Sequence, residues 1–256
     1  MNLYYKKIGH GKPLIILHGL FGMSDNWLTI SKRIAKRHTV YLLDQRNHGR
    51  SPHLDEFDYT ILSHDLEEFL QQQNLDRVRI IGHSMGGKAA MCFALKFPER
   101  VEKMVIVDIA LKKYNHPFFR NLLDFMDRFD LQSYTDRSEI DKAFKDVIPN
   151  PAVRHFILKN VSRRDDHSFG WKINVSSLSR NLDNIFAEVK PDKLFSGPVL
   201  VVRGAKSDYI LDEDMAEISK FFPNNKLVTI PNAGHWLHVE EEDTFCEELK
   251  LFFHAN

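Results

Sequence analysis

The sequence has few cysteines, no excess of charge of either sign and no hydrophobic run of membrane-spanning length. Its two cysteines, Cys92 and Cys246, fall in segments predicted to be helical, so we expect small buried side chains rather than a disulfide. Basic and acidic residues number 35 each, and this balance does not favour nucleic acid as a partner. No apolar run approaches the about 20 residues that cross a bilayer, and residues 1–7 turn polar at once instead of forming a signal core. We expect a soluble, cytoplasmic protein without a membrane span.

The sequence also lacks the usual patterns of metal and nucleotide sites. His18, His48 and His83 could suggest a metal, but no His-x-x-x-His, Cys-x-x-Cys or His-x-x-Glu-His pattern accompanies them. No Gly-x-Gly-x-x-Gly or Walker-type loop is present to hold a nucleotide. We therefore expect neither a metal site nor a cofactor.

Short β-rich apolar runs alternate with amphipathic helical stretches in the first half of the chain. This pattern predicts an α/β fold with a mostly parallel, twisted sheet and helices on both faces. Residues 3–8 and 14–17 flank a turn containing glycine and proline, which suggests an opening hairpin. Further strands are predicted at residues 40–43, 78–81, 104–107, 199–202 and 227–230.

The alternation stops between about residue 112 and residue 190. Bulky apolar residues recur there at helical spacing, and no long apolar strand is visible. We predict a core domain of residues 1–110 and 191–256, with a helical cap, or lid, inserted at 111–190. Five residues of the cap are candidates for lining a substrate pocket, although their spacing also suits ordinary packing: Phe118, Phe119, Leu122, Phe125 and Phe129.

The segment Gly82-His83-Ser84-Met85-Gly86 follows a predicted strand and precedes the small-residue start of a helix. A Gly-x-Ser-x-Gly sequence in this context is typical of a tight elbow, where glycines remove Cβ atoms that would clash. The elbow holds the serine hydroxyl clear of the backbone at the carboxyl end of a parallel strand. Ser84 is therefore the candidate nucleophile.

A serine hydroxyl is a poor nucleophile unless a base lies within hydrogen-bond reach. His235 follows the last predicted strand in a small-residue loop, so we expect it at the same edge of the sheet as Ser84. It also comes after Ser84 in the chain. We interpret His235 as the base rather than as a capping or packing residue.

Two aspartates could hold this base in one tautomer. Asp108 ends an apolar run on the strand after the elbow helix, where an unpaired carboxylate would be costly. Asp208 lies in a loop beyond the strand at 199–202. Both precede His235 and follow Ser84, so chain order does not separate them. The chemistry of the residues leaves the two about equal.

Acyl transfer also needs donors for the developing oxyanion. One is the backbone N–H of Met85, the residue after the nucleophile. The other is expected in the glycine-containing loop after residues 14–17, where we favour the Leu20 N–H over that of Phe21. We interpret His18 as a structural residue of this loop. The polar turn at residues 44–51 is also given a structural role.

The chain resembles the α/β-hydrolase superfamily, and the resemblance covers nearly all of it outside the insertion. Four motifs in order carry the resemblance: residues 18–19, 44–51, 82–87 and 234–235. Within this superfamily, the chain bears a closer similarity to the small bacterial esterases of the YbfF group. That similarity lies in residues 18–22, 46–49 and 107–110.

This resemblance bears on the acid. In the YbfF group the acid follows the strand after the elbow helix, and that position here is Asp108. In most of the superfamily the acid comes from a later strand, at the position that Ser207 occupies here. Asp208 is displaced from that position by one residue. A serine at the position of Ser207 is a feature of the same group, in which it supports the histidine. The resemblance thus favours Asp108 and keeps Asp208 open.

The resemblance implies hydrolysis of carboxylic esters, or of acyl thioesters such as acyl-CoA. Ser84 would attack, His235 would transfer the proton, and water would open the acyl-enzyme. Serine at the elbow excludes the epoxide hydrolases and haloalkane dehalogenases, which carry aspartate there. We expect a small-molecule acyl ester or thioester as substrate, and a monomer or small homo-oligomer.

Two other functions stay open. A lyase or C–C hydrolase of the same fold uses a similar triad on a different bond. A catalytically idle hydrolase fold could instead serve as a ligand receptor or interaction module. The complete set of nucleophile, base and donors argues against an idle fold.

Overall fold

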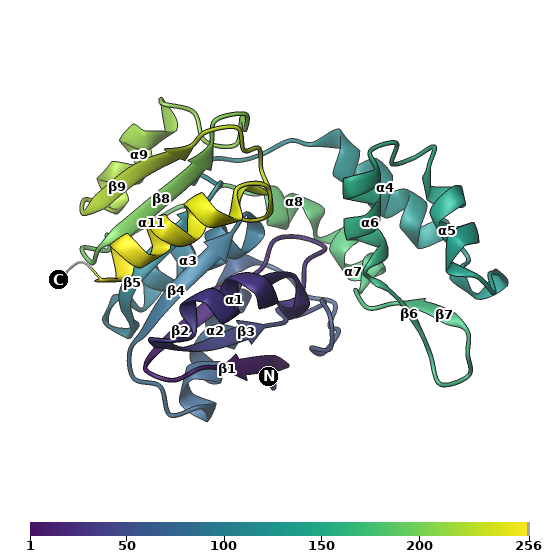
Figure 1. Cartoon of the computed structure of the whole chain (residues 1–256), viewed down its shortest axis with the longest axis horizontal. Helices are drawn as coiled ribbons and strands as arrows, with labels where there is room; N and C mark the ends of the chain where they lie inside the picture. The colour runs from purple at the N-terminus through teal and green to yellow at the C-terminus, as the bar shows by residue number, and fades with distance from the viewer. Residues whose placement is uncertain (255–256) are drawn as a thin grey trace.

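The computed structural model describes residues 1–254 and contains a seven-stranded sheet (Figure 1). The strand order is β1-β3-β2-β4-β5-β8-β9, and every neighbouring pair is parallel except β1 with β3. This confirms the predicted α/β fold with a mostly parallel sheet. The strands are β1 (Tyr5–Ile8), β2 (Lys12–Leu17), β3 (His38–Leu43), β4 (Val78–His83), β5 (Val101–Val107), β8 (Val199–Gly204) and β9 (Asn225–Ile230).

The predicted hairpin between the first two strands is wrong. β1 pairs antiparallel with β3, whereas β2 lies between β3 and β4 and is parallel to both. The turn after β1 passes close to the start of β3. A Cβ atom on Gly9 would lie 2.5 Å from the His38 carbonyl oxygen, and one on Gly11 would lie 2.4 Å from that of Arg37. Glycine is required for this close crossing, and the same glycine-rich turn would also suit a hairpin.

Helices cover both faces of the sheet (Figure 1). Residues of β2 alternate between the two resulting cores, because successive side chains of a strand point to opposite faces. Ile15 and Leu17 belong to the core under α2 and α3, and Leu14 and Ile16 to the core under α1 and α11. The helices are α1 (Leu28–Ile34), α2 (Tyr59–Gln72), α3 (Met85–Lys96), α9 (Asp214–Phe221), α10 (Leu237–Glu240) and α11 (Glu242–His254), with short 3₁₀ turns η1 (Ser24–Trp27) and η2 (Pro98–Arg100).

The segment between β5 and β8 lies beside the carboxyl end of the sheet (Figure 1). It is mostly helical, as expected, but it also contains a two-stranded hairpin that the sequence analysis missed. Each strand of this hairpin has only three residues, too few for an alternating pattern to be recognised. The segment holds α4 (Pro117–Arg128), η3 (Leu131–Ser133), α5 (Arg137–Phe144), α6 (Pro151–Leu158), β6 (Val161–Arg163), β7 (Phe169–Trp171), α7 (Val175–Arg180) and α8 (Leu182–Phe186).

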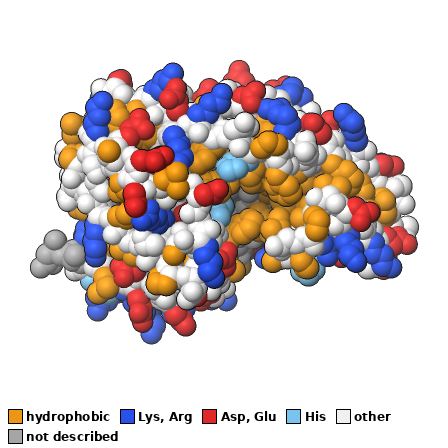
Figure 2. Space-filling view, turned by 90° about the horizontal axis from the view of Figure 1, so that it is seen from above, with side chains coloured by type: hydrophobic (Ala, Val, Ile, Leu, Met, Phe, Trp, Pro, Cys, Tyr) orange, Lys and Arg blue, Asp and Glu red, His pale blue; other side chains and the backbone are white. Residues whose placement is uncertain are grey.

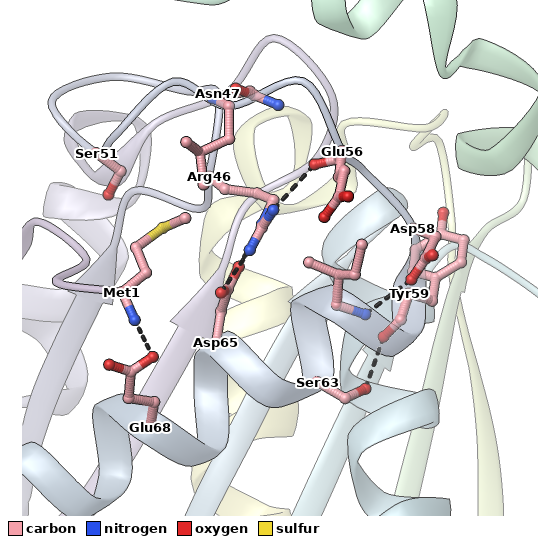
Figure 3. Close-up of polar contacts among 12 residues, drawn as sticks. Met1, Arg46, Asn47, Ser51, Glu56, Asp58, Tyr59, Ser63, Asp65 and Glu68 are labelled. Atoms are coloured by element: carbon pink, nitrogen blue, oxygen red, sulfur yellow. Dashed lines mark hydrogen bonds and ion pairs between the residues drawn. The ribbon is translucent and has the colours of Figure 1, made fainter.

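The polar turn after β3 is anchored by one buried ion pair and by hydrogen bonds to backbone and side-chain groups. The Arg46 guanidinium donates to both carboxylate oxygens of Asp65 on α2, at 2.5 and 2.7 Å, and to the Glu56 carbonyl (Figure 3). Asn47, with a positive φ of 64°, donates through its side chain to Ser177 of α7 at 3.0 Å. The turn therefore joins the sheet, α2 and the segment between β5 and β8, which agrees with the structural role expected for residues 44–51.

Two expectations concern single features of the chain. Cys92 and Cys246 are both free thiols, as predicted. Within residues 1–254, no helix combines the length and apolarity that crossing a bilayer would require.

Candidate active site

Ser84 lies at the tight junction between β4 and α3. Its backbone has φ 53° and ψ −120°, a conformation that is unfavourable for a residue with a side chain and is found at functional sites. A Cβ atom on Gly82 would lie 2.3 Å from the Gly86 carbonyl oxygen, and one on Gly86 would lie 2.3 Å from that of Leu17. Both glycines are thus required by the packing of the elbow against itself and against β2. The elbow leaves the Ser84 side chain partly exposed at the carboxyl edge of the sheet.

His235 lies in the loop between β9 and α10 and lines the same pocket as Ser84. Its Nδ1 atom is 2.8 Å from Oδ2 of Asp108, so Nδ1 carries the proton and Nε2 is free to accept one. The ring of Tyr209 stacks on that of His235 with centroids 3.7 Å apart. His83 donates from Nε2 to the His235 carbonyl at 2.9 Å, and burial lowers the pKa of His83 well below its usual value, which keeps that ring neutral. These contacts hold the loop and the imidazole in place.

Asp108 is the carboxylate that the structure brings to His235. It follows β5 with a φ of 51° and is completely buried. Its carboxylate also accepts hydrogen bonds from the Ser207 hydroxyl and, at 3.2 Å, from the Gly204 N–H. Asp208 is exposed and contributes no hydrogen bond to His235. Burial of Asp108 is thus compensated by three donors, as a charge out of water requires.

The loop after β2 passes next to the elbow. A Cβ atom on Gly19 would lie 3.2 Å from Cβ of Ser84, closer than an ordinary van der Waals contact, so glycine eases this approach. His18 accepts the Gln45 N–H at Nε2, at 3.1 Å, and donates from Nδ1 to the Gly19 carbonyl at 2.8 Å. Burial lowers the pKa of His18 to about 4, and the ring is neutral at ordinary pH. His18 therefore has the position of a structural residue in the loop that carries Leu20.

The two predicted donors are the N–H groups of Met85, which follows Ser84 in the chain, and of Leu20, which lines a cavity with Ser84 and Met85. Leu20 lines the pocket with Ser84, and Met85 is the first residue of α3, where backbone N–H groups have no partner within the helix. Neither N–H donates a hydrogen bond to any group in residues 1–254. The N-terminus of α3 also carries the positive end of the helix dipole. Together with the free N–H groups, it would stabilise a negative charge that develops beside Ser84.

The pocket at Ser84 has a volume of about 50 Å³, room for only a few water molecules. Figure 2 shows hydrophobic side chains gathered in a hollow beside histidine side chains on this face. Of the candidate lining residues, Phe118 and Phe119 reach the pocket, while Phe125 and Phe129 pack on Phe144 instead. Leu122 is completely buried and does not line the pocket. The pocket is also lined by residues that the sequence pattern did not indicate, among them Val153, Phe156 and Ile157 of α6, and Trp236 and His238 close to His235.

A second, smaller cavity of about 20 Å³ lies on another side of Ser84. It is lined by Lys88, which is almost fully buried one helical turn after Ser84. The Lys88 Nζ atom donates to the Lys112 carbonyl at 2.7 Å and to the Ala187 carbonyl at 2.5 Å. Lys112 lies in the connection between β5 and α4, and Ala187 lies in the connection between α8 and β8. Lys88 thus ties both connections to α3. Nothing in its sequence position signalled this role, because a lysine at a helix surface is ordinarily solvated.

No set of three His, Cys, Asp or Glu side chains within the described part of the chain is arranged to hold a metal ion. His18 and His48 are neighbours, with ring centroids 5.0 Å apart. Burial lowers the pKa of His48 to about 3, and its Nδ1 lies 2.9 Å from the Arg46 carbonyl, so its role is in packing of the turn.

The chain is similar to known proteins along nearly its whole length. A family model described as alpha/beta hydrolase fold matches residues 12–144. The chain is 34% identical to an sn-1-specific diacylglycerol lipase ABHD11 of Danio rerio, covering 95% of this chain and 79% of that protein. It is 31% identical to a putative esterase/lipase of Haemophilus influenzae, covering 95% and 83%. A solved structure of a marine microorganism esterase superimposes with a TM-score of 0.95 at 42% identity, covering 98% of each chain.

Proposed function

The chain belongs to the α/β-hydrolase family and is related to small esterases, and from this we propose that it is a serine hydrolase cleaving carboxylic esters. In this proposal Ser84 is the nucleophile, His235 is the general base and Asp108 is the acid that holds the base. The observation that carries the proposal is the 2.8 Å contact of His235 Nδ1 with Asp108, in a loop that lines the Ser84 pocket. This contact leaves Nε2 of His235 free to accept the proton of the Ser84 hydroxyl.

The reaction follows from the roles of these groups. Ser84 Oγ attacks the ester carbonyl carbon while His235 Nε2 takes the hydroxyl proton. The carbonyl oxygen becomes an oxyanion, which accepts hydrogen bonds from the N–H groups of Met85 and Leu20. His235 then gives its proton to the leaving alkoxide, and an acyl group stays on Ser84. Water, deprotonated by His235, attacks the acyl-enzyme and releases the carboxylic acid.

Ser207 supports the acid in this proposal. Its hydroxyl donates to the same oxygen of Asp108, Oδ2, that contacts His235. A donor on this carboxylate fixes its orientation and reduces the cost of burying the charge. Ser207 is thus a supporting residue and does not touch the reacting atoms.

The substrate class follows from the pocket. Its small volume and apolar lining favour short, uncharged acyl groups unless side chains of residues 111–190 move aside. We propose that this segment is a cap whose helices α4 and α6 supply Phe119 and Phe156 to the acyl pocket. We propose oxygen esters as the preferred substrates because relatives are described as lipases and esterases. Acyl thioesters are the alternative substrate, which the same mechanism would cleave.

The proposal is tested with purified protein and p-nitrophenyl acetate, butyrate and octanoate. We expect turnover that Ser84→Ala abolishes while the folded state, measured by circular dichroism, is unchanged. A fluorophosphonate probe should label the wild-type protein at Ser84 and leave the Ser84→Ala variant unlabelled. Acetyl- and butyryl-thioesters in the same assay decide between ester and thioester preference. Wild-type turnover no higher than that of Ser84→Ala on every ester and thioester would favour a receptor, lyase or C–C hydrolase.

A further inference from the structure

Asn160 connects the segment 111–190 to the loop that carries Leu20. It follows Lys159, the C-cap residue of α6, and is completely buried. Its Nδ2 atom donates to the Phe21 carbonyl at 2.9 Å and to the Ile157 carbonyl at 3.1 Å. The contact with Phe21 joins residues 139 positions apart. A side chain of the insertion thereby holds the backbone of the loop next to Ser84.

The loop that Asn160 contacts is a tight turn whose backbone conformation is unfavourable for the residues in it. The Gly22 N–H donates to the Gly19 carbonyl at 2.9 Å, so residues 19–22 form a β-turn. Of its two central residues only Phe21 has a positive φ, 62°, which defines a type II turn. That position favours glycine, and an aromatic side chain there is strained. A strained conformation persists only where the surroundings hold it.

Two contacts that hold Phe21 come from the insertion. Asn160 binds its carbonyl oxygen, and its ring stacks on Phe119 of α4 with centroids 6.0 Å apart. Phe21 itself is 1% exposed. Without these contacts the turn can relax to type I, in which the central peptide is reversed and the Leu20 carbonyl exchanges sides with the Phe21 N–H. The reversal does not turn the preceding peptide, which carries the Leu20 N–H, but a turn that is no longer anchored can shift as a whole relative to the Ser84 pocket that both residues line.

We propose that Asn160 is a positioning residue for ester hydrolysis, anchoring the 19–22 turn so that the Leu20 N–H keeps its place beside the oxyanion. This inference rests on the proposed function. It makes the insertion part of the apparatus that stabilises the transition state, in addition to being a wall of the acyl pocket. Asn160 acts through the turn and does not touch the substrate.

A purely structural role for Asn160 is disfavoured by its other side-chain atom. Oδ1 of Asn160 is buried and accepts no hydrogen bond in residues 1–254. A buried acceptor without a partner is destabilising, and leucine at the same place would avoid that cost. The benefit of the amide therefore lies in the donation from Nδ2, which binds the Phe21 carbonyl of the turn and the Ile157 carbonyl of α6.

The test compares Asn160→Leu with wild type on p-nitrophenyl acetate. We expect kcat to fall about 10- to 100-fold with KM within about threefold, because the lost interaction acts in the transition state. Affinity for a trifluoromethyl ketone, which forms an oxyanion adduct with the serine, should fall in parallel with kcat/KM. Asn174→Leu is the matched control. Asn174 ties the insertion to Asn47 and Leu54, away from the 19–22 turn, and its kcat should stay within about twofold of wild type.

A second variant separates turn geometry from general loosening. Phe21→Gly places at this position the residue that adopts a positive φ without strain. In the Phe21→Gly background, Asn160→Leu should lower kcat by less than about threefold, because the turn no longer depends on the amide. If Asn160→Leu does not fold, Asn160→Ala is used in both backgrounds.

Three results would overturn the inference. One is a kcat of Asn160→Leu within twofold of wild type, another is an equal loss in Asn174→Leu, and the third is an undiminished loss in the Phe21→Gly background. Failure of the proposed function gives a different result, because the wild-type protein itself would then show no turnover and no fluorophosphonate labelling of Ser84.

Discussion

The Nδ1 atom of His235 lies 2.8 Å from Oδ2 of Asp108, although 127 residues separate them in the chain. The same carboxylate oxygen accepts the hydroxyl of Ser207. Because β5 and β8 are adjacent parallel strands and β9 follows β8 in the sheet, the residues after these strands meet at one edge. The contact is thus a consequence of strand order, and it makes the roles of the two aspartates testable.

Asp108→Asn should lower kcat far more than Asp208→Asn. An amide cannot hold the His235 tautomer as a carboxylate does, and in serine hydrolases with such a triad this change costs about ten-thousand-fold. Asp208 is exposed and does not contact His235, so its variant should stay within about twofold of wild type. Steady-state kinetics on p-nitrophenyl acetate measures both. The opposite ranking would assign the acid to Asp208.

Ser207→Ala should lower kcat about 10- to 100-fold, because a hydrogen bond to a charged group contributes about 1.5–3 kcal/mol. Ser207→Thr retains the hydroxyl and should restore most of the activity. The measurement is kcat at several pH values with thermal unfolding as a control for folding. Full activity in Ser207→Ala would show that the donor to Asp108 is dispensable.

We expect the free energy of unfolding of the wild type to increase with pH above pH 7. Lys88→Met should remove part of this increase. Burial lowers the pKa of Lys88 from 10.5 to about 7. Between these values the unfolded chain binds the proton and the folded chain does not, so stability increases with pH by at most about 1.4 kcal/mol per pH unit. Urea unfolding at pH 7, 8 and 9 of wild type and Lys88→Met measures the difference in slope.

Lys96→Met is the control for this experiment, because Lys96 lies on the same helix and is exposed. It should leave the slope of the wild type unchanged. Parallel pH dependence of wild type and Lys88→Met would contradict the prediction and imply that the Lys88 ammonium stays charged in the folded protein.

His238→Phe should make the protein less sensitive to acid. Burial lowers the pKa of His238 from 6.5 to about 3, while its ring stacks on Trp27 with centroids 4.3 Å apart. The unfolded chain therefore gains a proton below pH 6.5 that the folded chain excludes, and stability is lost as pH falls toward 3. Phenylalanine keeps the stack and removes the proton, so the loss between pH 6 and 4 should shrink by about 1 kcal/mol per pH unit. Denaturant unfolding at these pH values tests it.

The exposed His155 on α6 provides the comparison for that experiment. His155→Phe should keep the acid dependence of the wild type. An equal change in both variants would attribute the effect to net charge rather than to burial of His238.

Much of the fold was predictable from local sequence. Strands buried on both faces are continuous apolar runs, as in β4 and β5, and these were recognised within a few residues of their bounds. The elbow around Ser84 was also predictable, since a strand, two glycines and a helix start are all local signals. The partner of β1 was not, because a glycine turn specifies that the chain bends and leaves open which strand it then meets.

The sequence by itself determined most strands of a mostly parallel sheet, the position of Ser84 at an elbow, and His235 in a loop after the last strand. The residues alone left Asp108 and Asp208 about equal and the family resemblance favoured Asp108, but only the tertiary structure places Asp108 against His235, because that contact joins loops after different strands. It also decided which insertion residues reach Ser84: Phe119 and Phe156 line the pocket, and Asn160 holds the 19–22 turn. Local patterns specify helices and strands, whereas contacts between distant segments follow from how those elements pack.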